Sequence, residues 1–198
     1  MHRLREGIEA ISLWMARFGG FLLIATSVLL SIEIIARKFA LMPFSIGTEL
    51  SMYALAASAS WSFSYALLRR AHVRIDVIRN LTGPRVRAAL DLLALFALGA
   101  LAIVMTRYVW DTVETSWSLG ARENTPLGTP LVIPQGIWFV GLCWFVVVCV
   151  EQIILAVAAA VRRDFAALAA IAAPAGVDDE ITEALGTMPP QRSPAAEA

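Results

Sequence analysis

Four long runs of apolar residues alternate with short charged stretches along the chain. They cover about residues 18–38, 50–68, 88–109 and 137–161. A helix needs about 20 predominantly apolar residues to cross a bilayer, and each run comes near that length. The runs are apolar nearly all round, whereas a surface helix of a soluble protein carries a single apolar stripe. The pattern therefore predicts an all-α integral membrane protein with four transmembrane helices.

Composition strengthens this interpretation. Of the 198 residues, 59% are hydrophobic and only 16% are charged, and the mean hydropathy is +0.70. One soluble core cannot hide this much apolar surface, so membrane lipids are the natural surroundings of the chain. No basic face alternates with aromatic residues, which argues against nucleic acid as a partner.

Lysine and arginine are distributed unequally between the two sides that four spans create. Twelve of the 16 lie before the first run, between the second and third, or after the fourth. The opposite side holds only four: Arg37 and Lys38 at the end of the first run, Arg107 near the end of the third, and Arg122 in the connection that follows. Positive residues concentrate in cytoplasmic segments, so both termini and the middle loop are predicted to be cytoplasmic.

The runs divide the chain into three parts. Residues 1–17 are predicted to be a cytoplasmic, interfacial N-terminal segment, and residues 18–163 hold the four-helix membrane domain. Residues 164–198 form a cytoplasmic tail whose end is rich in proline and small residues, and we expect it to be largely disordered. Its beginning, within "RRDFAALAAIAAP", is predicted to form a short interfacial helix.

Charged side chains gather around the connection between the first two runs. Glu33 and Arg37 have the favourable spacing and order of a helical ion pair, and Glu49 lies where a carboxylate suits the dipole of the second helix. The short connection predicts antiparallel neighbours, with Glu33 and Glu49 sharing Arg37 and with Lys38 as a second candidate partner. Since ionisable groups in membranes seldom face lipid, these groups either pair locally at the membrane interface or bind another subunit.

The second run carries small residues at four-residue spacing: Ala54, Ser58, Ser62 and Ala66. Small residues let the backbones of two membrane helices approach closely. The spacing predicts a tightly packed helix face, in this chain or against another subunit.

Glu151 lies roughly midway along the fourth run, with Gln152 beside it. A carboxylate is costly at this depth of a bilayer. We expect Glu151 either to face protein or to be protonated, and a role in proton coupling is the second interpretation.

The middle loop contains His72, Arg74 and Asp76. Helical spacing of its polar residues, with Val73 and Val77 on an apolar side, predicts a short amphipathic helix on the inner surface. A His–Asp pair alone is no active site, because catalysis also needs a nucleophile and a pocket. A metal site needs at least one more ligand. We therefore predict no enzyme and no metal site.

Residues 111–136 connect the third and fourth runs and contain Pro126, Pro130 and Pro134. These prolines predict that the connection is not one continuous helix. It either folds back onto the membrane surface or meets an extracytoplasmic partner.

Several stretches together resemble a known family. They are "GTELSMY" at the second run, "LLRRAHVRIDVI" after it, "GPRVRAALDLLAL" leading into the third, "VIPQGIWFVGL" before the fourth, and Arg37. In this order they resemble the DctQ-like small permease subunit of tripartite ATP-independent periplasmic (TRAP) transporters, over about residues 10–163. One position departs from the family pattern: Thr48 stands where an acid often precedes the glutamate.

The resemblance implies a non-enzymatic subunit of the bacterial inner membrane that needs no cofactor. It would scaffold a large multi-span, DctM-like permease that carries the substrate and sodium sites. A periplasmic solute-binding protein would deliver a small organic acid or related solute for sodium-coupled uptake, with residues 111–136 helping to receive it. The candidate subunit-interface residues are Glu33, Arg37, Glu49, Ser58, Ser62, His72, Arg74, Asp76 and Glu151.

Two other classes of membrane protein compete with this interpretation. A stand-alone proton-coupled transporter would use Glu33 or Glu151, but Glu33 lies near a helix end with a basic neighbour. A membrane haem protein needs axial ligands, and the two histidines, His2 and His72, lie outside the four runs.

Overall fold

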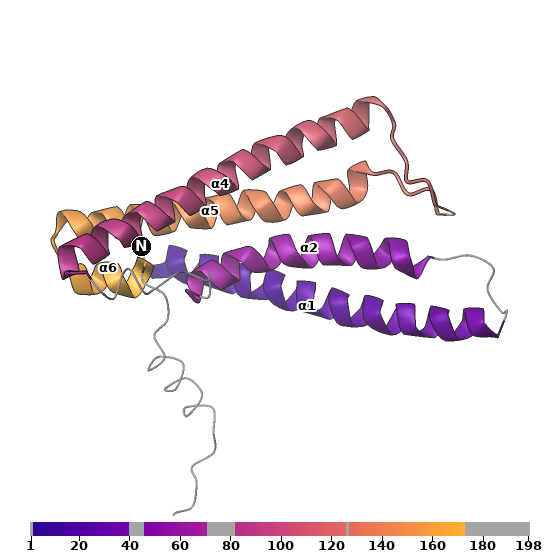
Figure 1. Ribbon diagram of the computed structural model, residues 1–198, viewed down its shortest axis with the longest axis horizontal. Helices are drawn as coiled ribbons and strands as arrows, with labels where there is room; N and C mark the ends of the chain where they lie inside the picture. Colours follow the sequence, from indigo (N-terminus) through magenta and orange to yellow (C-terminus); the bar gives the residue numbers. More distant parts are fainter. Residues whose placement is uncertain (1, 40–45, 71–81, 126, 173–198) are drawn as a thin grey trace, which may run out of the picture.

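The computed structural model describes residues 2–39, 46–70, 82–125 and 127–172. The regular elements within these ranges are helices, apart from one isolated bridge between Arg122 and Pro130, so the all-α prediction is confirmed. The helices are α1 (His2–Lys38), α2 (Gly47–Leu68), α4 (Pro84–Ser118), α5 (Val132–Val161) and α6 (Phe165–Ala172) (Figure 1).

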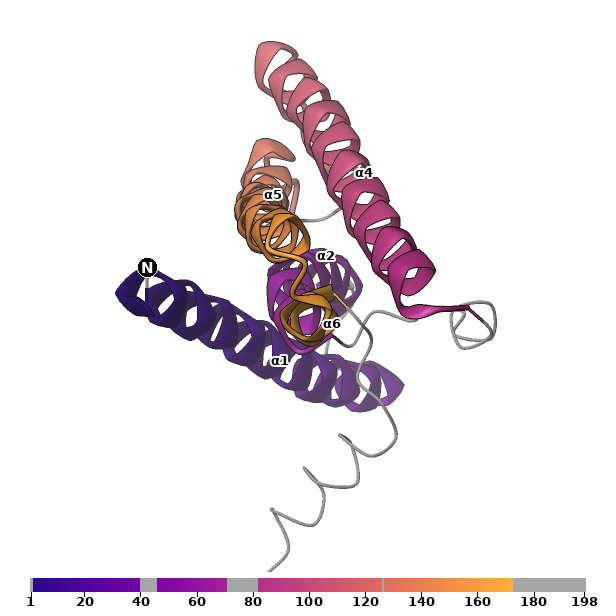
Figure 2. The same cartoon turned by 90° about the vertical axis from the view of Figure 1, so that its left-hand side faces the viewer.

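The long helices pack in the order α1, α2, α5, α4. Helix α1 contacts α2, α2 also contacts α5, and α5 contacts α4. Viewed end-on, α2 and α5 occupy the middle while α1 and α4 lie outside (Figure 2). Helices α1 and α2 run antiparallel, as predicted (Figure 1). The short α6 folds back against α4 and α5 and buries Leu168 and Ala172.

Within the ranges that the structure describes, three helices are long and apolar enough to cross a membrane: α1, α4 and α5. Helix α2 falls short of this because serines, Trp61 and two tyrosines lower its apolar character. Its place between α1 and α5 explains this composition, since much of its surface meets protein instead of lipid. A transmembrane course of α2, which the sequence predicts, stays a prediction.

Helix α4 is longer than its apolar run, and this corrects the prediction for the outer connection. The helix continues through polar residues to Ser118, and Gly120, with φ +56°, then ends it. The N–H groups of Gly120 and Ala121 donate to the carbonyls of Trp117 and Ser116, which is the Schellman pattern of helix ends. Residues 119–131 alone form the connection, so the break in the helix is confirmed but its predicted extent was too wide.

Proline at the other end of this connection does not interrupt α5. The helix starts at Val132, which places Pro134 in its first turn, where the missing N–H group breaks no hydrogen bond within the helix. At the opposite end of the chain, α1 continues from His2 to Lys38 without a break, so the N-terminal segment and the first apolar run share one helix.

Glycines set the spacing on both sides of α2. A Cβ added to Gly19 of α1 would lie 2.9 Å from the Cα of Ser58, and one added to Gly141 of α5 would lie 2.5 Å from the Ser60 Oγ. The closely packed small-residue face is therefore confirmed at Ser58, and its neighbour belongs to the same chain. Ser62, which the sequence places on the same face, is only half-buried. Helix α2 packs against both α1 and α5, so its buried residues lie on two sides and not along one stripe.

Two indole groups add hydrogen bonds between helices. The Nε1 of Trp144 in α5 donates to the Oγ of Ser12 in α1 over 3.0 Å, and the Nε1 of Trp61 in α2 donates to the carbonyl of Ile137 over 3.0 Å. One bond joins α5 to α1 and the other joins α5 to α2, so α5 is held to both members of the α1–α2 pair.

Replacing Gly141 by alanine should destabilise the fold by about 1–3 kcal/mol, the usual cost of overpacking. The added Cβ would press on the side chains of both Ser60 and Trp61, so two neighbours would have to move at once. Thermal unfolding in detergent measures the effect. The control is Gly136→Ala in the same helix, where a Cβ meets nothing within 4 Å. Equal melting temperatures for the two variants would contradict the close packing.

Candidate subunit interface and outer-face network

Glu33 of α1 caps the start of α2. One carboxylate oxygen accepts a hydrogen bond from Arg37, which confirms the predicted ion pair. The other accepts the backbone N–H of Ile46 over 3.1 Å and that of Gly47. The Ile46 side chain cannot cap the helix, so the carboxylate of the neighbouring helix binds the positive end of the α2 dipole.

The geometry of this cap explains a glycine at the first position of α2. A Cβ on Gly47 would lie 2.7 Å from the Glu33 Oε2 and 3.0 Å from the Leu30 side chain. Glu33 itself is only 5% exposed, whereas half of the Arg37 side chain remains accessible. Arg37 is thus the accessible member of the Glu33–Arg37 ion pair.

Glu49 has different partners from Glu33. It is 1% exposed and accepts the Tyr53 hydroxyl over 2.8 Å and the Thr125 hydroxyl, and Thr129 lies against the same carboxylate. The prediction that Glu33 and Glu49 share Arg37 is therefore wrong. Folding brings Thr125 and Thr129 to the first turns of α2, and their hydroxyl groups satisfy Glu49 in place of the arginine.

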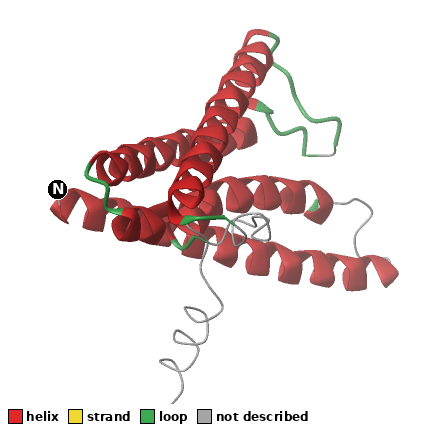
Figure 3. Cartoon of the chain, turned by 60° about the vertical axis from the view of Figure 1, so that its left-hand side comes forward, coloured by secondary structure: helices red, strands yellow, loops and turns green. Residues whose placement is uncertain are grey.

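The outer connection is a narrow hairpin, drawn as a loop in Figure 3. The Glu123 N–H donates to the Thr129 carbonyl, and the Leu131 N–H donates to the Ala121 carbonyl, each over 3.0 Å. Near its tip, Thr125 bonds to Glu49 of α2. The hairpin thus packs on α2, and both courses expected from the sequence, along the membrane surface or toward an extracytoplasmic partner, stay predictions. We call Glu49, Tyr53, Thr125 and Thr129 the outer-face network, after the extracytoplasmic side on which the distribution of arginines predicts it to lie.

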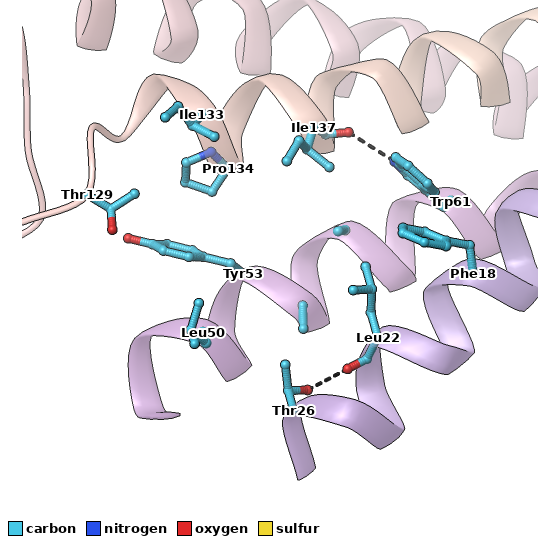
Figure 4. A pocket seen from close by; sticks show the side chains of 12 residues that line it. Phe18, Leu22, Thr26, Leu50, Tyr53, Trp61, Thr129, Ile133, Pro134 and Ile137 are labelled. Carbon is cyan, nitrogen blue, oxygen red and sulfur yellow. Dashed lines mark hydrogen bonds between the residues drawn. The ribbon is translucent and has the colours of Figure 1, made fainter. Parts of the chain in front are cut away.

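An apolar groove of about 470 Å³ lies beneath this network, between α1, α2 and the start of α5 (Figure 4). Tyr53 and Thr129 line the end nearest the network, with their hydroxyl groups pointing toward each other, and Phe18 and Trp61 line the opposite end. The remaining lining residues are Leu22, Thr26, Leu50, Ala54, Ala57, Ile133, Pro134 and Ile137.

The remaining candidates from the sequence are dispersed. Glu151 is half-buried and accepts a hydrogen bond from the buried Gln152 amide over 3.1 Å. His72, Arg74 and Asp76 lie outside the described residues. Among the residues that are described, no three His, Cys, Asp or Glu side chains come together in a way that could hold a metal ion.

Residues 26–159 match the family described as "Tripartite ATP-independent periplasmic transporters, DctQ component". This chain belongs to the DctQ family. Members are components of a transporter and not enzymes. Searches among curated proteins and among solved structures gave no match. The matched region includes Glu33, the outer-face network and most of the groove, whereas the first part of α1 and all of α6 lie outside it.

Removing the cap on α2 should lower stability. The Glu33→Ala variant leaves two backbone N–H groups and Arg37 without this carboxylate, and the loss of a helix cap costs typically about 1 kcal/mol. The Glu33→Gln variant keeps an oxygen that can accept a backbone N–H, so its melting temperature in detergent should fall less. An alanine variant that melts with the unmodified protein would contradict the capping role.

Releasing Thr125 should loosen the outer hairpin. The Thr125→Val variant has a side chain of similar shape but cannot donate to Glu49, so trypsin should cut faster after the exposed Arg122. The Thr125→Ser variant retains a hydroxyl group and should be cut at nearly the original rate. Equal cleavage rates for all three proteins would show that this bond does not hold the hairpin.

Proposed function

We propose that this protein is the small membrane subunit of a TRAP-type secondary importer, in which it scaffolds the large permease subunit. The observation that carries the proposal is the DctQ family match across residues 26–159. The family works with a large DctM subunit and a periplasmic binding protein. Three apolar helices of sufficient length agree with a place in the bacterial inner membrane.

A scaffold must resist deformation, and the packing of this chain supports that role. The α1–α2 and α2–α5 contacts are close approaches at glycine, and indole hydrogen bonds reinforce the hold of α5 on both neighbours. Close-packed interiors transmit strain and yield little. The large subunit carries the moving parts in this proposal, and the small subunit gives them a fixed support.

Burial sorts the interface candidates into two groups. Glu33, Glu49 and Ser58 are buried within this chain, so they support the interface by shaping α1 and α2. The accessible side of Arg37 and the half-buried Ser62 and Glu151 can contact the large subunit directly. For the middle-loop residues 72, 74 and 76, an inner-face contact is proposed from the sequence alone.

The outer-face network supports a second partner contact. It holds the hairpin at the end of the molecule away from α6, and α6 follows the arginine-rich end of α5. With cytoplasmic termini, as the distribution of arginines predicts, the hairpin faces the periplasm. We propose that it helps to receive the solute-binding protein, which delivers a small organic acid for sodium-coupled uptake.

Co-purification and uptake together test this function. Tagged chain extracted from its native membranes in gentle detergent should retain a large polytopic permease in fixed stoichiometry. Cells with the large subunit and the binding protein should accumulate solute only when this chain is also present. Sodium dependence of uptake, followed with a panel of labelled organic acids, tests the coupling ion and the solute class.

Liposomes containing the purified chain alone supply the control. A scaffold carries no solute by itself, so these liposomes should show no proton-driven flux. Flux through the lone chain, or its recovery as a homo-oligomer in several detergents, would contradict the scaffold role. Either result would make Glu151 a candidate proton carrier again.

A further inference from the structure

We propose that the groove between α1, α2 and α5 is a binding site for one acyl chain of a phospholipid. The lipid belongs to the membrane leaflet on the side of the outer-face network. This site is independent of the transport role, because it depends on the shape and polarity of the groove.

The groove has the polarity of a lipid. At one end, the hydroxyl groups of Tyr53 and Thr129 meet beside the buried Glu49 carboxylate (Figure 4). From there inward, nearly all the lining side chains are apolar. The groove closes at Phe18 and Trp61, whose ring centroids lie 5.6 Å apart. A lipid chain entering from the polar end would find hydrocarbon contacts along its length, with its ester region near the two hydroxyls.

Small residues on α2 create this space. Ala54 and Ala57 line it where larger side chains would bring α2 into full contact with the first turns of α5. The same helix is drawn close to α5 further along, where Gly141 meets Ser60. The opening therefore sits between a close contact at one end and the tethered hairpin at the other.

The surroundings decide between the possible occupants. Two of the three helices around the groove, α1 and α5, are long and apolar enough to cross a membrane, and an apolar space holds hydrocarbon in preference to water. Ligand pockets in proteins typically measure roughly 300–1,000 Å³, and the groove, at about 470 Å³, falls within this range.

Native mass spectrometry of the full chain in mild detergent tests the proposal, with palmitoyl-oleoyl phosphatidylethanolamine as the added probe. The unmodified protein should retain one phospholipid through washing. In the Ala57→Phe variant, the new ring fills the groove, and the peak with one lipid should disappear. The control is Leu55→Phe on the same helix, where residue 55 is 60% exposed and lines no part of the groove. It should keep the lipid.

A second blocking variant guards against misfolding at position 57. Thr26 lines the groove from α1 and is only half-buried, so Thr26→Phe narrows the groove without altering the packing of α2 against α5. Unmodified protein that retains no lipid would overturn the proposal. So would lipid retention by folded Thr26→Phe equal to that of the control. A complex with the large subunit that lacks the lipid, and in which a photo-crosslinker at Leu22 captures that subunit, would also overturn it.

Discussion

The structure depends on how closely α2 approaches both of its neighbours. Helices in lipid gain little from the hydrophobic effect when they associate, because the acyl chains around them are equally apolar. Packing contacts and hydrogen bonds must hold them instead. Gly19 and Gly141 allow these contacts on opposite sides of α2, and Ser58 and Ser60 meet them there. Without these two contacts, the α1–α2 helix pair and the α4–α5 helix pair would not pack closely against each other.

The carboxylates at the outer face follow from the same geometry. Once α2 is placed, its first backbone N–H groups need acceptors, and Glu33 of the adjacent helix supplies one. Glu49, two residues further along α2, accepts hydrogen bonds from Tyr53 of the same helix and from Thr125 and Thr129 of the connection between α4 and α5. Each acid thus joins α2 to another part of the chain. These hydrogen bonds stabilise the end of the fold that carries residues 119–125 and 127–131.

A scaffolding role and a lipid site suit the same molecule. The middle layers, α2 and α5, are held by contacts within the chain, whereas α1 and α4 expose large apolar side chains along their length. In a membrane such surfaces meet lipid or another protein. A permanently bound acyl chain in the groove would complete the packing of α1 against α5 at the outer end. It would add to the rigidity that the proposed scaffolding role requires.

Much of this protein can be predicted from its sequence, because the bilayer imposes a length and an apolarity on every spanning helix. The long helices, the antiparallel α1–α2 pair, the Glu33–Arg37 ion pair and the DctQ family all follow from local patterns and their order. The end of α4 was misplaced because polar residues 110–118 are compatible with a helix until Gly120 stops it. The spacing of Glu49 and Tyr53 is a local signal for one bond of the outer-face network.

Tertiary structure alone decided the remaining features. The partners of Glu49 come from positions 53, 125 and 129, and only the folding of the hairpin onto α2 brings the last two within reach. The groove likewise combines ordinary apolar residues from α1, α2 and α5 that no motif connects. The physical reason is common to both: local sequence determines where a helix begins and which residues share its face, whereas contacts between distant segments depend on how the helices pack.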